Sequence, residues 1–246
     1  MAEWITGRVL ENKRWTERLH SLRVEATFPA FEAGQFTRLA LTINDELVSR
    51  PFSLVNAPDD PILDFYFIEV PDGTLSPTLK ALKVGDDIMV APKASGLLTL
   101  KQLAPADKLF LFATGTGLGP FLSIIKTQAV WQQFSEVRLV HAVRYAEELS
   151  YQDDIQTCQQ THPEQFRYQP IVSREAADNA LAGRIPRLIE NGLLERALGN
   201  EIDSNSQILL CGNPDMVLET TETLLARGLT RHSRREPGHI SIEKYW

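Results

Sequence analysis

The chain has 246 residues, of which 43% are hydrophobic, and a formal net charge of −7 at pH 7. A general affinity for nucleic acid is therefore not expected, because such affinity depends on neutralising phosphate charge with basic residues. The 2 cysteines cannot ligate an all-cysteine iron–sulfur cluster, and the length suits one large or two modest domains.

Targeting and metal-binding signals are missing from the sequence. The first residues, Met1 to Trp4, lack the basic flank and apolar core of a signal peptide, and no run approaches the ~20 apolar residues of a membrane helix. We therefore expect a cytoplasmic protein without membrane contact. The 5 histidines are scattered, and neither cysteine has the spacing of a zinc ligand, so no metal site is predicted.

The first hundred residues have the pattern of an antiparallel β domain. Short runs of alternating apolar and polar residues are separated by turn residues such as Gly, Asn, Asp and Pro. The expected strands lie at 7–10, 19–24, 36–41, 51–55, 65–70 and 87–90. Together with one helical turn at 76–82, these six strands predict a small antiparallel β-barrel.

From about residue 107, apolar strands alternate with helical segments. The expected strands lie at 109–113, 137–143, 166–172 and 207–211. The expected helices lie at 120–134, 148–161, 184–198 and 214–227. This alternation predicts a parallel sheet flanked by helices, so the chain divides into a barrel domain (1–100) and an α/β nucleotide-binding domain (101–246).

A glycine-rich loop follows the first strand of the second half. Gly115, Gly117 and Gly119 allow a tight turn and a close backbone approach, and Pro120 fits the first turn of a helix. A buried strand, such a loop and a helix start together favour an anion site, because free N–H groups converge there. The spacing differs from the G-x-G-x-x-G fingerprint, and an ordinary strand-to-helix turn stays the alternative.

Three arginines follow later segments of the α/β half. Arg144 follows the second strand and Arg174 the third, and carboxyl ends of parallel strands converge on one ligand crevice. Arg184 follows Gly183. A cation in place of an acidic residue suits a phosphate better than a ribose hydroxyl. The alternative is that these arginines form surface pairs with nearby glutamates, namely Glu147, Glu148 or Glu175.

Four motifs in order resemble the ferredoxin–NADP reductase superfamily, and the resemblance covers essentially the whole chain. They are Arg50-Pro51-Phe52-Ser53, Pro71-Asp72-Gly73-Thr74-Leu75-Ser76, Gly115-Thr116-Gly117-Leu118-Gly119-Pro120 and Cys211-Gly212-Asn213-Pro214. The ending 239–246 is similar to the compact bacterial ferredoxin/flavodoxin–NADP reductases.

The resemblance implies an FAD-dependent oxidoreductase with FAD on the barrel and NADP(H) on the α/β domain. A hydride would pass from NADPH to flavin N5, and single electrons would then pass to ferredoxin or flavodoxin. Such carriers are acidic, so docking requires a local basic patch, for which the candidates are Arg14, Arg38, Arg234 and Arg235. A monomer is expected.

The resemblance also assigns the FAD site. Arg50 would pair with the pyrophosphate, Phe52 would lie against the isoalloxazine ring, and Ser53 would bond near N5. Phe52 stands where the family has tyrosine, so the ring can stack but the hydroxyl is missing. Trp246 would stack on the adenine. The full set implied for FAD is Arg50, Pro51, Phe52, Ser53, Tyr66, Phe67, Ile68, Gly73, Thr74, Leu75, Ser76, Thr116 and Trp246.

For NADP and catalysis, the resemblance implies Cys211 beside the nicotinamide and Glu243 as a proton relay near the flavin, with Ser53 as the third catalytic residue. The alternatives are a buried, inert thiol for Cys211 and a solvated tail residue for Glu243. The set implied for NADP is Gly115, Gly117, Arg144, Ser173, Arg174, Arg184, Cys211 and Gly212.

Three alternative functions stay open. The first is a free-flavin reductase, which uses flavin as a substrate. The second is the reductase component of an oxygenase, which the missing cluster cysteines disfavour. The third is a non-enzymatic nucleotide sensor, which the intact Ser53, Gly117 and Cys211 disfavour.

Overall fold

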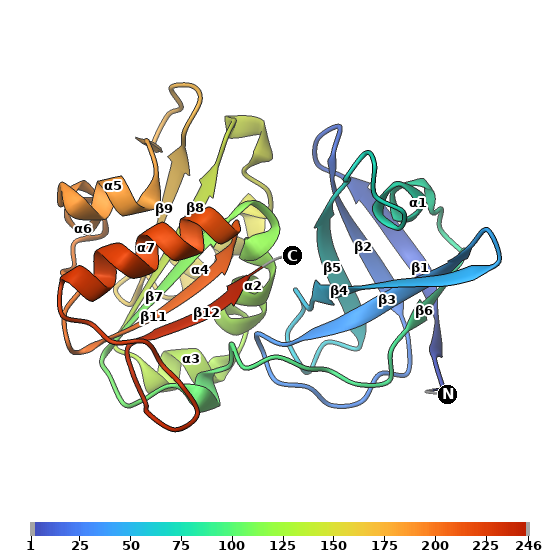
Figure 1. Cartoon of the computed structure of the whole chain (residues 1–246), viewed down its shortest axis with the longest axis horizontal. Coiled ribbons are helices and arrows are strands. Elements are labelled where there is room, and N and C mark those ends of the chain that lie inside the picture. Colours follow the sequence, from blue (N-terminus) through green and yellow to red (C-terminus); the bar gives the residue numbers. More distant parts are fainter. Residues whose placement is uncertain (1–2, 245–246) are drawn as a thin grey trace.

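The computed structural model describes residues 3–244, which form two domains side by side, each built on one sheet (Figure 1). In the first domain the strand order is β4-β3-β6-β1-β2-β5, and the pairings are antiparallel. Its elements are β1 (Ile5–Arg14), β2 (Leu19–Glu25), β3 (Phe36–Ile43), β4 (Glu46–Ser53), β5 (Ile62–Ile68), α1 (Ser76–Ala81) and β6 (Asp87–Val90).

The edges of this sheet meet after β4. A bridge between Leu54 and Phe65 joins the two edge strands and curls the sheet, so the predicted six-stranded antiparallel barrel is confirmed. Strand β4 starts earlier than the predicted 51–55, because Asn44 and Asp45 have φ of 52° and 64° and form a tight hairpin turn. Pro51 is compatible with β4 because this strand lies at the sheet edge.

The second domain has a fully parallel sheet in the order β10-β9-β8-β7-β11-β12. Its strands are β7 (Lys108–Thr114), β8 (Glu136–Val143), β9 (Phe166–Val172), β10 (Leu181–Ala182), β11 (Ser206–Gly212) and β12 (Ile240–Lys244). The four central strands match the prediction. The sequence did not indicate β10 and β12, which are short edge strands without a continuous apolar run.

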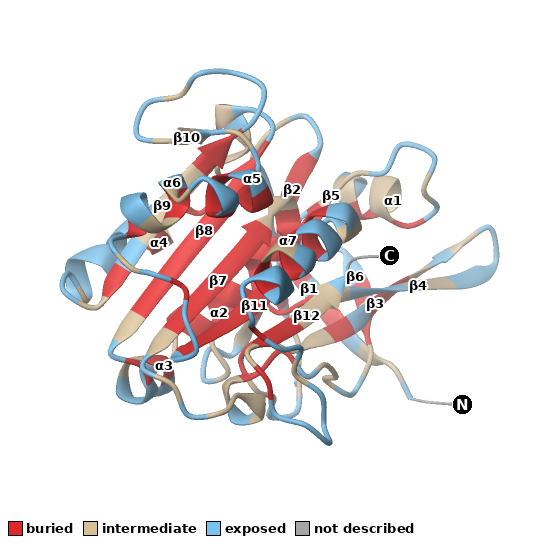
Figure 2. Ribbon diagram, turned by 60° about the vertical axis from the view of Figure 1, so that its left-hand side comes forward, coloured by how far each residue is buried: buried red, intermediate tan, exposed pale blue. Residues whose placement is uncertain are grey.

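Helices cover both faces of the parallel sheet (Figure 2). One face carries α2 (Gly119–Ile125), α3 (Gln128–Gln133) and α4 (Gln152–Thr161). The other carries α5 (Ile185–Glu190), α6 (Leu193–Leu198) and α7 (Pro214–Ala226). Short 3₁₀ turns lie at η1 (Leu100–Gln102), η2 (Gly115–Leu118) and η3 (Ala146–Glu148). No helix within residues 3–244 is long and apolar enough to cross a bilayer.

Three predicted helices were too long. The helix predicted at 120–134 is interrupted before Gln128, where the Thr127 hydroxyl donates to the Ile124 carbonyl at 2.8 Å and competes with the helical pattern. The helix predicted at 184–198 is divided at Gly192, which has φ of 70°. The helix predicted at 148–161 begins only at Gln152, because the preceding Tyr151 is left-handed, with φ of 58°.

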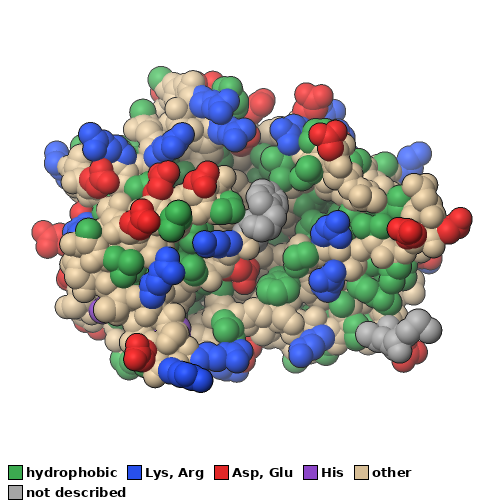
Figure 3. Space-filling model, in the orientation of Figure 1, with side chains coloured by type: hydrophobic (Ala, Val, Ile, Leu, Met, Phe, Trp, Pro, Cys, Tyr) green, Lys and Arg blue, Asp and Glu red, His purple; other side chains and the backbone are tan. Residues whose placement is uncertain are grey.

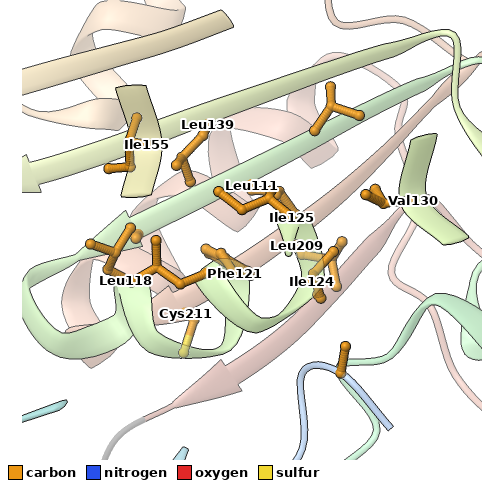
Figure 4. Close-up of a cluster of buried hydrophobic side chains, with 14 of the residues drawn as sticks. Leu111, Leu118, Phe121, Ile124, Ile125, Val130, Leu139, Ile155, Leu209 and Cys211 are labelled. Carbon is orange, nitrogen blue, oxygen red and sulfur yellow. The ribbon is translucent and has the colours of Figure 1, made fainter. Parts of the chain in front are cut away.

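The two domains share a packed interface. One hydrophobic cluster contains Val55 and Tyr66 from the barrel together with Leu111 and Phe121 from the α/β domain. Figure 4 shows part of this cluster, in which side chains of α2 lie against β7 and β11. Because apolar packing continues from one domain into the other, the two domains are held in a defined relative position.

Polar contacts cross the same interface. The Tyr66 hydroxyl donates to Ser150 Oγ at 2.9 Å, and the Ser123 hydroxyl donates to the Asn56 carbonyl at 2.7 Å. The Tyr151 hydroxyl contacts both carboxylate oxygens of Asp64, at 3.2 and 3.3 Å. Burial raises the pKa of Asp64 to about 6, so at neutral pH this domain contact holds a carboxylate that is poorly solvated.

Replacing Asp64 with asparagine tests this electrostatic penalty. A raised pKa in the folded protein means that the carboxyl group favours folding below about pH 4 and loses this contribution as the pH rises to about 6. We expect Asp64→Asn to raise the free energy of unfolding at about pH 8 by on the order of 2 kcal/mol in urea titrations. The gain should shrink towards about pH 4.

The exposed Asp59, replaced by asparagine, provides the control and should change the free energy of unfolding little at either pH. A less stable Asp64→Asn protein at the higher pH would mean that the carboxylate stabilises the interface.

Candidate functional site

The barrel motif and the glycine loop meet at the junction of the two domains. Ser53 is buried at the end of β4, and Gly119 begins α2. A Cβ placed on Gly119 would lie 3.6 Å from Ser53 Cβ and 3.3 Å from Val55 Cγ2. The structure therefore brings together two motifs that lie more than sixty residues apart in the sequence.

Backbone packing holds the end of β7 against the end of β11. A Cβ on Gly117 would overlap the Cys211 carbonyl, and a Cβ on Gly212, which has φ of 128°, would overlap Thr114. The Asn213 N–H donates to Thr114 Oγ1 at 2.8 Å. Both glycines are thus required where the two strand ends approach each other, independently of any ligand.

Gly115 differs from the other glycines of this loop. Its φ is 52°, and no atom lies within 4 Å of a Cβ placed there, so this face of the loop borders open space. Its carbonyl oxygen lies 3.0 Å from Nε2 of His141. Thr116 is buried in η2. The loop consequently combines a fixed backbone with an accessible side.

Cys211 and Glu243 lie at the same level of the sheet. They are paired in the register of β11 and β12, and Cys211 is fully buried in the cluster that contains Phe121 (Figure 4). One carboxylate oxygen of Glu243 lies 3.3 Å from a Cβ placed on Gly96, which belongs to the segment after the barrel. Burial raises the pKa of Glu243 to about 7, so its carboxyl group can hold or release a proton near neutral pH.

On the barrel, Arg50 and Phe52 lie on the edge strand β4. Arg50 is exposed, and its guanidinium donates to the Ser49 carbonyl at 2.8 Å. The ring of Phe52 is half-buried and meets that of Phe67 edge-on, with centroids 6.2 Å apart. Pro51, between them, is exposed. A cation and an aromatic ring therefore share one edge of the barrel.

The predicted FAD residues on β5 are mostly enclosed. Tyr66 belongs to the domain interface, and Phe67 belongs to the barrel core, where it stacks on His20 with ring centroids 5.7 Å apart. Ile68 is half-buried. These side chains support the surface on which Phe52 lies.

The segment before α1 is a tight turn that its own residues stabilise. The Gly73 N–H donates to the Val70 carbonyl at 2.8 Å, and the Val70 N–H donates to Ser76 Oγ at 2.9 Å. Leu75 is buried in the barrel core, whereas Thr74 is exposed. Ser76 thus uses its hydroxyl to hold the turn.

The arginine-bearing loops after β8 and β9 are joined to each other. The Arg174 N–H donates to the Arg144 carbonyl at 3.0 Å, and the Arg174 guanidinium lies 6.0 Å from the Tyr145 ring centroid. Ser173 Oγ donates to the Val143 carbonyl at 3.2 Å. Arg184 precedes α5 and, like the other two arginines, is exposed.

The alternative pairing of these arginines with nearby glutamates is wrong for the described part of the chain. The Glu148 carboxylate accepts the N–H groups of Arg144 and Tyr145, at 2.8 and 3.0 Å, and Glu175 accepts that of Ala146 at 2.6 Å. No ion pair among residues 3–244 involves Arg144, Arg174 or Arg184. Their guanidinium groups stay available to an anionic ligand.

The sequence assigned no role to two residues of this site, although Asn213 belongs to the fourth motif. Asn213 caps α7 by accepting the N–H groups of Asp215 and Met216, and its position before Pro214 is typical of a helix start. His141 contacts the glycine loop although it belongs to β8. The sequence signal for His141 is that it is a polar residue within an apolar stretch of β8. Among residues 3–244, His, Cys, Asp and Glu side chains form no group of three that could hold a metal ion.

Comparisons with known proteins agree with this arrangement. Residues 111–222 match a family model described as the oxidoreductase NAD-binding domain. The flavodoxin/ferredoxin–NADP reductases of Shigella flexneri and Escherichia coli (strain K12) are each 46% identical over 248 aligned positions, which cover 100% of both chains. The structure of a ferredoxin NADP⁺ reductase from Neisseria gonorrhoeae with bound FAD and NADP has a TM-score of 0.93 and 31% identity, over 99% of each chain.

Proposed function

Because the chain belongs to the flavodoxin/ferredoxin–NADP reductase family, we propose that it transfers electrons between NADP(H) and a ferredoxin or flavodoxin with FAD as its cofactor. The close approach of Ser53 to Gly119 is the observation that carries this function, because it joins the barrel motif to the glycine loop. An oxidoreductase that passes electrons between two cofactors requires such a junction.

The residues on the barrel suit FAD. The exposed guanidinium of Arg50 takes part in no ion pair of residues 3–244 and can accommodate a pyrophosphate, while the half-buried ring of Phe52 offers a flat apolar contact. The Gly73 N–H closes the turn on the Val70 carbonyl, and the following Thr74, Leu75 and Ser76 supply backbone N–H groups at the start of α1. Pro51, Tyr66, Phe67 and Ile68 shape this surface, which we assign to residues 1–100.

The residues on the α/β domain suit NADP(H). Arg144 and Arg174 come from adjacent loops, are exposed and take part in no ion pair of the described residues, so they can bind the 2′-phosphate. Ser173 and Arg184 flank them. The open side of Gly115, with Gly117, Cys211 and Gly212 behind it, can receive the rest of the nucleotide. We assign these contacts to the domain 101–246.

At the junction, Ser53, Thr116, Cys211 and Glu243 orient the reacting groups. When bound, FAD would supply a group that can take up a hydride from NADPH and release electrons singly, which a nicotinamide cannot readily do. Ser53 and Cys211 are buried and exclude water, and Glu243 holds a proton close by. The proposed stacking of Trp246 on adenine concerns a residue outside the described range. The last described residue, Lys244, pairs with Gly212.

An acidic carrier protein requires positive charge near the junction. Figure 3 shows Lys and Arg side chains on both domains around the hollow between them, although the chain as a whole is acidic. We propose that this face attracts ferredoxin or flavodoxin. The candidate contacts predicted from the sequence, Arg14, Arg38, Arg234 and Arg235, are all exposed. A cytoplasmic location and a monomeric state stay predictions from the sequence.

The carrier assay tests the proposed function. The purified flavoprotein with NADPH should reduce a small acidic ferredoxin or flavodoxin with saturation at micromolar concentration. The rate should fall with added salt, because charges separated by more than ~8–10 Å are screened. Saturable reduction of free riboflavin, without response to either carrier, would instead place the chain among free-flavin reductases. A protein that binds no flavin would fit a nucleotide sensor.

Replacing Arg174 with alanine tests the 2′-phosphate site. A charge-assisted hydrogen bond contributes ~1.5–3 kcal/mol, and ~1.4 kcal/mol corresponds to tenfold. We therefore expect Arg174→Ala to lower kcat/KM for NADPH by about one to two decades in steady-state assays and to leave that for NADH nearly unchanged. Arg8→Ala, an exposed barrel arginine paired with Asp87, is the control. Equal losses for both nucleotides would refute this role.

Replacing Glu243 with glutamine tests the proton site. With its pKa near 7, the carboxyl group is protonated below and ionised above neutral pH, so a proton held there is lost as the pH rises. We expect turnover of the unaltered protein to fall between about pH 6 and pH 8, and that of Glu243→Gln to be flat. Glu236→Gln, at an exposed position in the preceding loop, should retain the slope. An unchanged pH profile in Glu243→Gln would exclude the role.

A further inference from the structure

His141 is a fully buried polar residue in the middle of the parallel sheet. Strand β8 places it between Ala113 of β7 and Pro170 of β9, and its side chain has no exposed surface. Its Nε2 lies 3.0 Å from the carbonyl oxygen of Gly115. A carbonyl oxygen only accepts, so Nε2 carries the hydrogen and donates it.

The other ring nitrogen indicates why the histidine is present. Nδ1 is buried and has no hydrogen-bond partner among residues 3–244, which is unfavourable for a polar atom. Burial also lowers the pKa of His141 to about 4, so the ring is neutral at pH 7. An aliphatic side chain would pack here without an unpaired atom, so packing alone does not account for a histidine. The bond to Gly115 is the one polar contact that the described residues give to this ring.

That bond is located where the glycine loop begins. Gly115 is left-handed and has open space beside it, so neighbouring atoms do not confine it on that side. Further along, the loop is confined at Gly117 by the Cys211 backbone and at Gly119 by Val55 and Ser53. The His141 contact is therefore a third attachment, at the end of the loop that packing leaves open.

We propose that His141 is a positioning residue, whose Nε2–H holds the Gly115 carbonyl and so fixes residues 115–119 in the form that receives the pyridine nucleotide. This inference rests on the proposed function for the identity of the ligand. It concerns the loop itself, however, and can also be measured without any ligand.

Two variants of equal polarity test the inference. In His141→Gln the amide nitrogen can reach the position of Nε2 and donate to Gly115, whereas the shorter amide of His141→Asn cannot. Val140→Ala, which removes apolar volume from the opposite face of the same strand, controls for general destabilisation. The holoprotein of each is examined by amide hydrogen exchange over residues 115–119 and by calorimetric titration with NADP⁺.

We expect His141→Asn to exchange the loop amides faster and to bind NADP⁺ about three- to tenfold more weakly, the fold-change of one lost neutral hydrogen bond. His141→Gln and Val140→Ala should stay close to the unaltered protein in both measurements. Unchanged loop exchange in His141→Asn, or equal changes in Val140→Ala, would overturn the inference. If the unaltered protein binds no NADP⁺, the proposed function fails, and the exchange measurement still decides the role of His141.

Discussion

The close approach of the β7 and β11 strand ends is the constraint on which the junction depends. Side chains at positions 117 and 212 would overlap backbone atoms of the neighbouring strand end, so glycine is required at both. With these strands in contact, η2 and the start of α2 are directed towards the barrel, where Gly119 meets Ser53. The position of the barrel motif relative to the glycine loop thus depends on the absence of a side chain at these two positions.

Packing at the interface preserves that relative position. Val55 and Tyr66 belong to the same hydrophobic cluster as Leu111 and Phe121, so separating the domains would expose a continuous core. Hydrogen bonds of Tyr66 and Ser123 across the interface fix the direction in which the surfaces meet. The two domains are therefore not independent bodies on a flexible linker. Electron transfer over a short distance requires that they keep this fixed relative position.

The strands that could be predicted from the sequence are those that local patterns of apolar and polar residues define. Alternating runs located the barrel, and the apolar run before Gly115 located the central strand of the second sheet. It did not predict the breaks at Thr127 and Gly192, because a side-chain bond to the preceding turn or a single left-handed residue ends a helix without changing its apolar period. Nor could it predict β12, whose pairing with β11 depends on tertiary structure.

The same distinction between local patterns and tertiary contacts applies to the candidate site. Motifs of adjacent residues, such as the turn around Gly73, can be recognised in sequence, whereas contacts between strands cannot. The pKa of Glu243 is raised because the carboxyl group is buried, and it lies beside Cys211 and near Gly96, on three segments that meet only after folding. His141 likewise contacts the glycine loop only because β8 lies beside β7. Glu243 and His141 therefore obtain their surroundings from the folded sheet, and the local sequence around each residue does not show them.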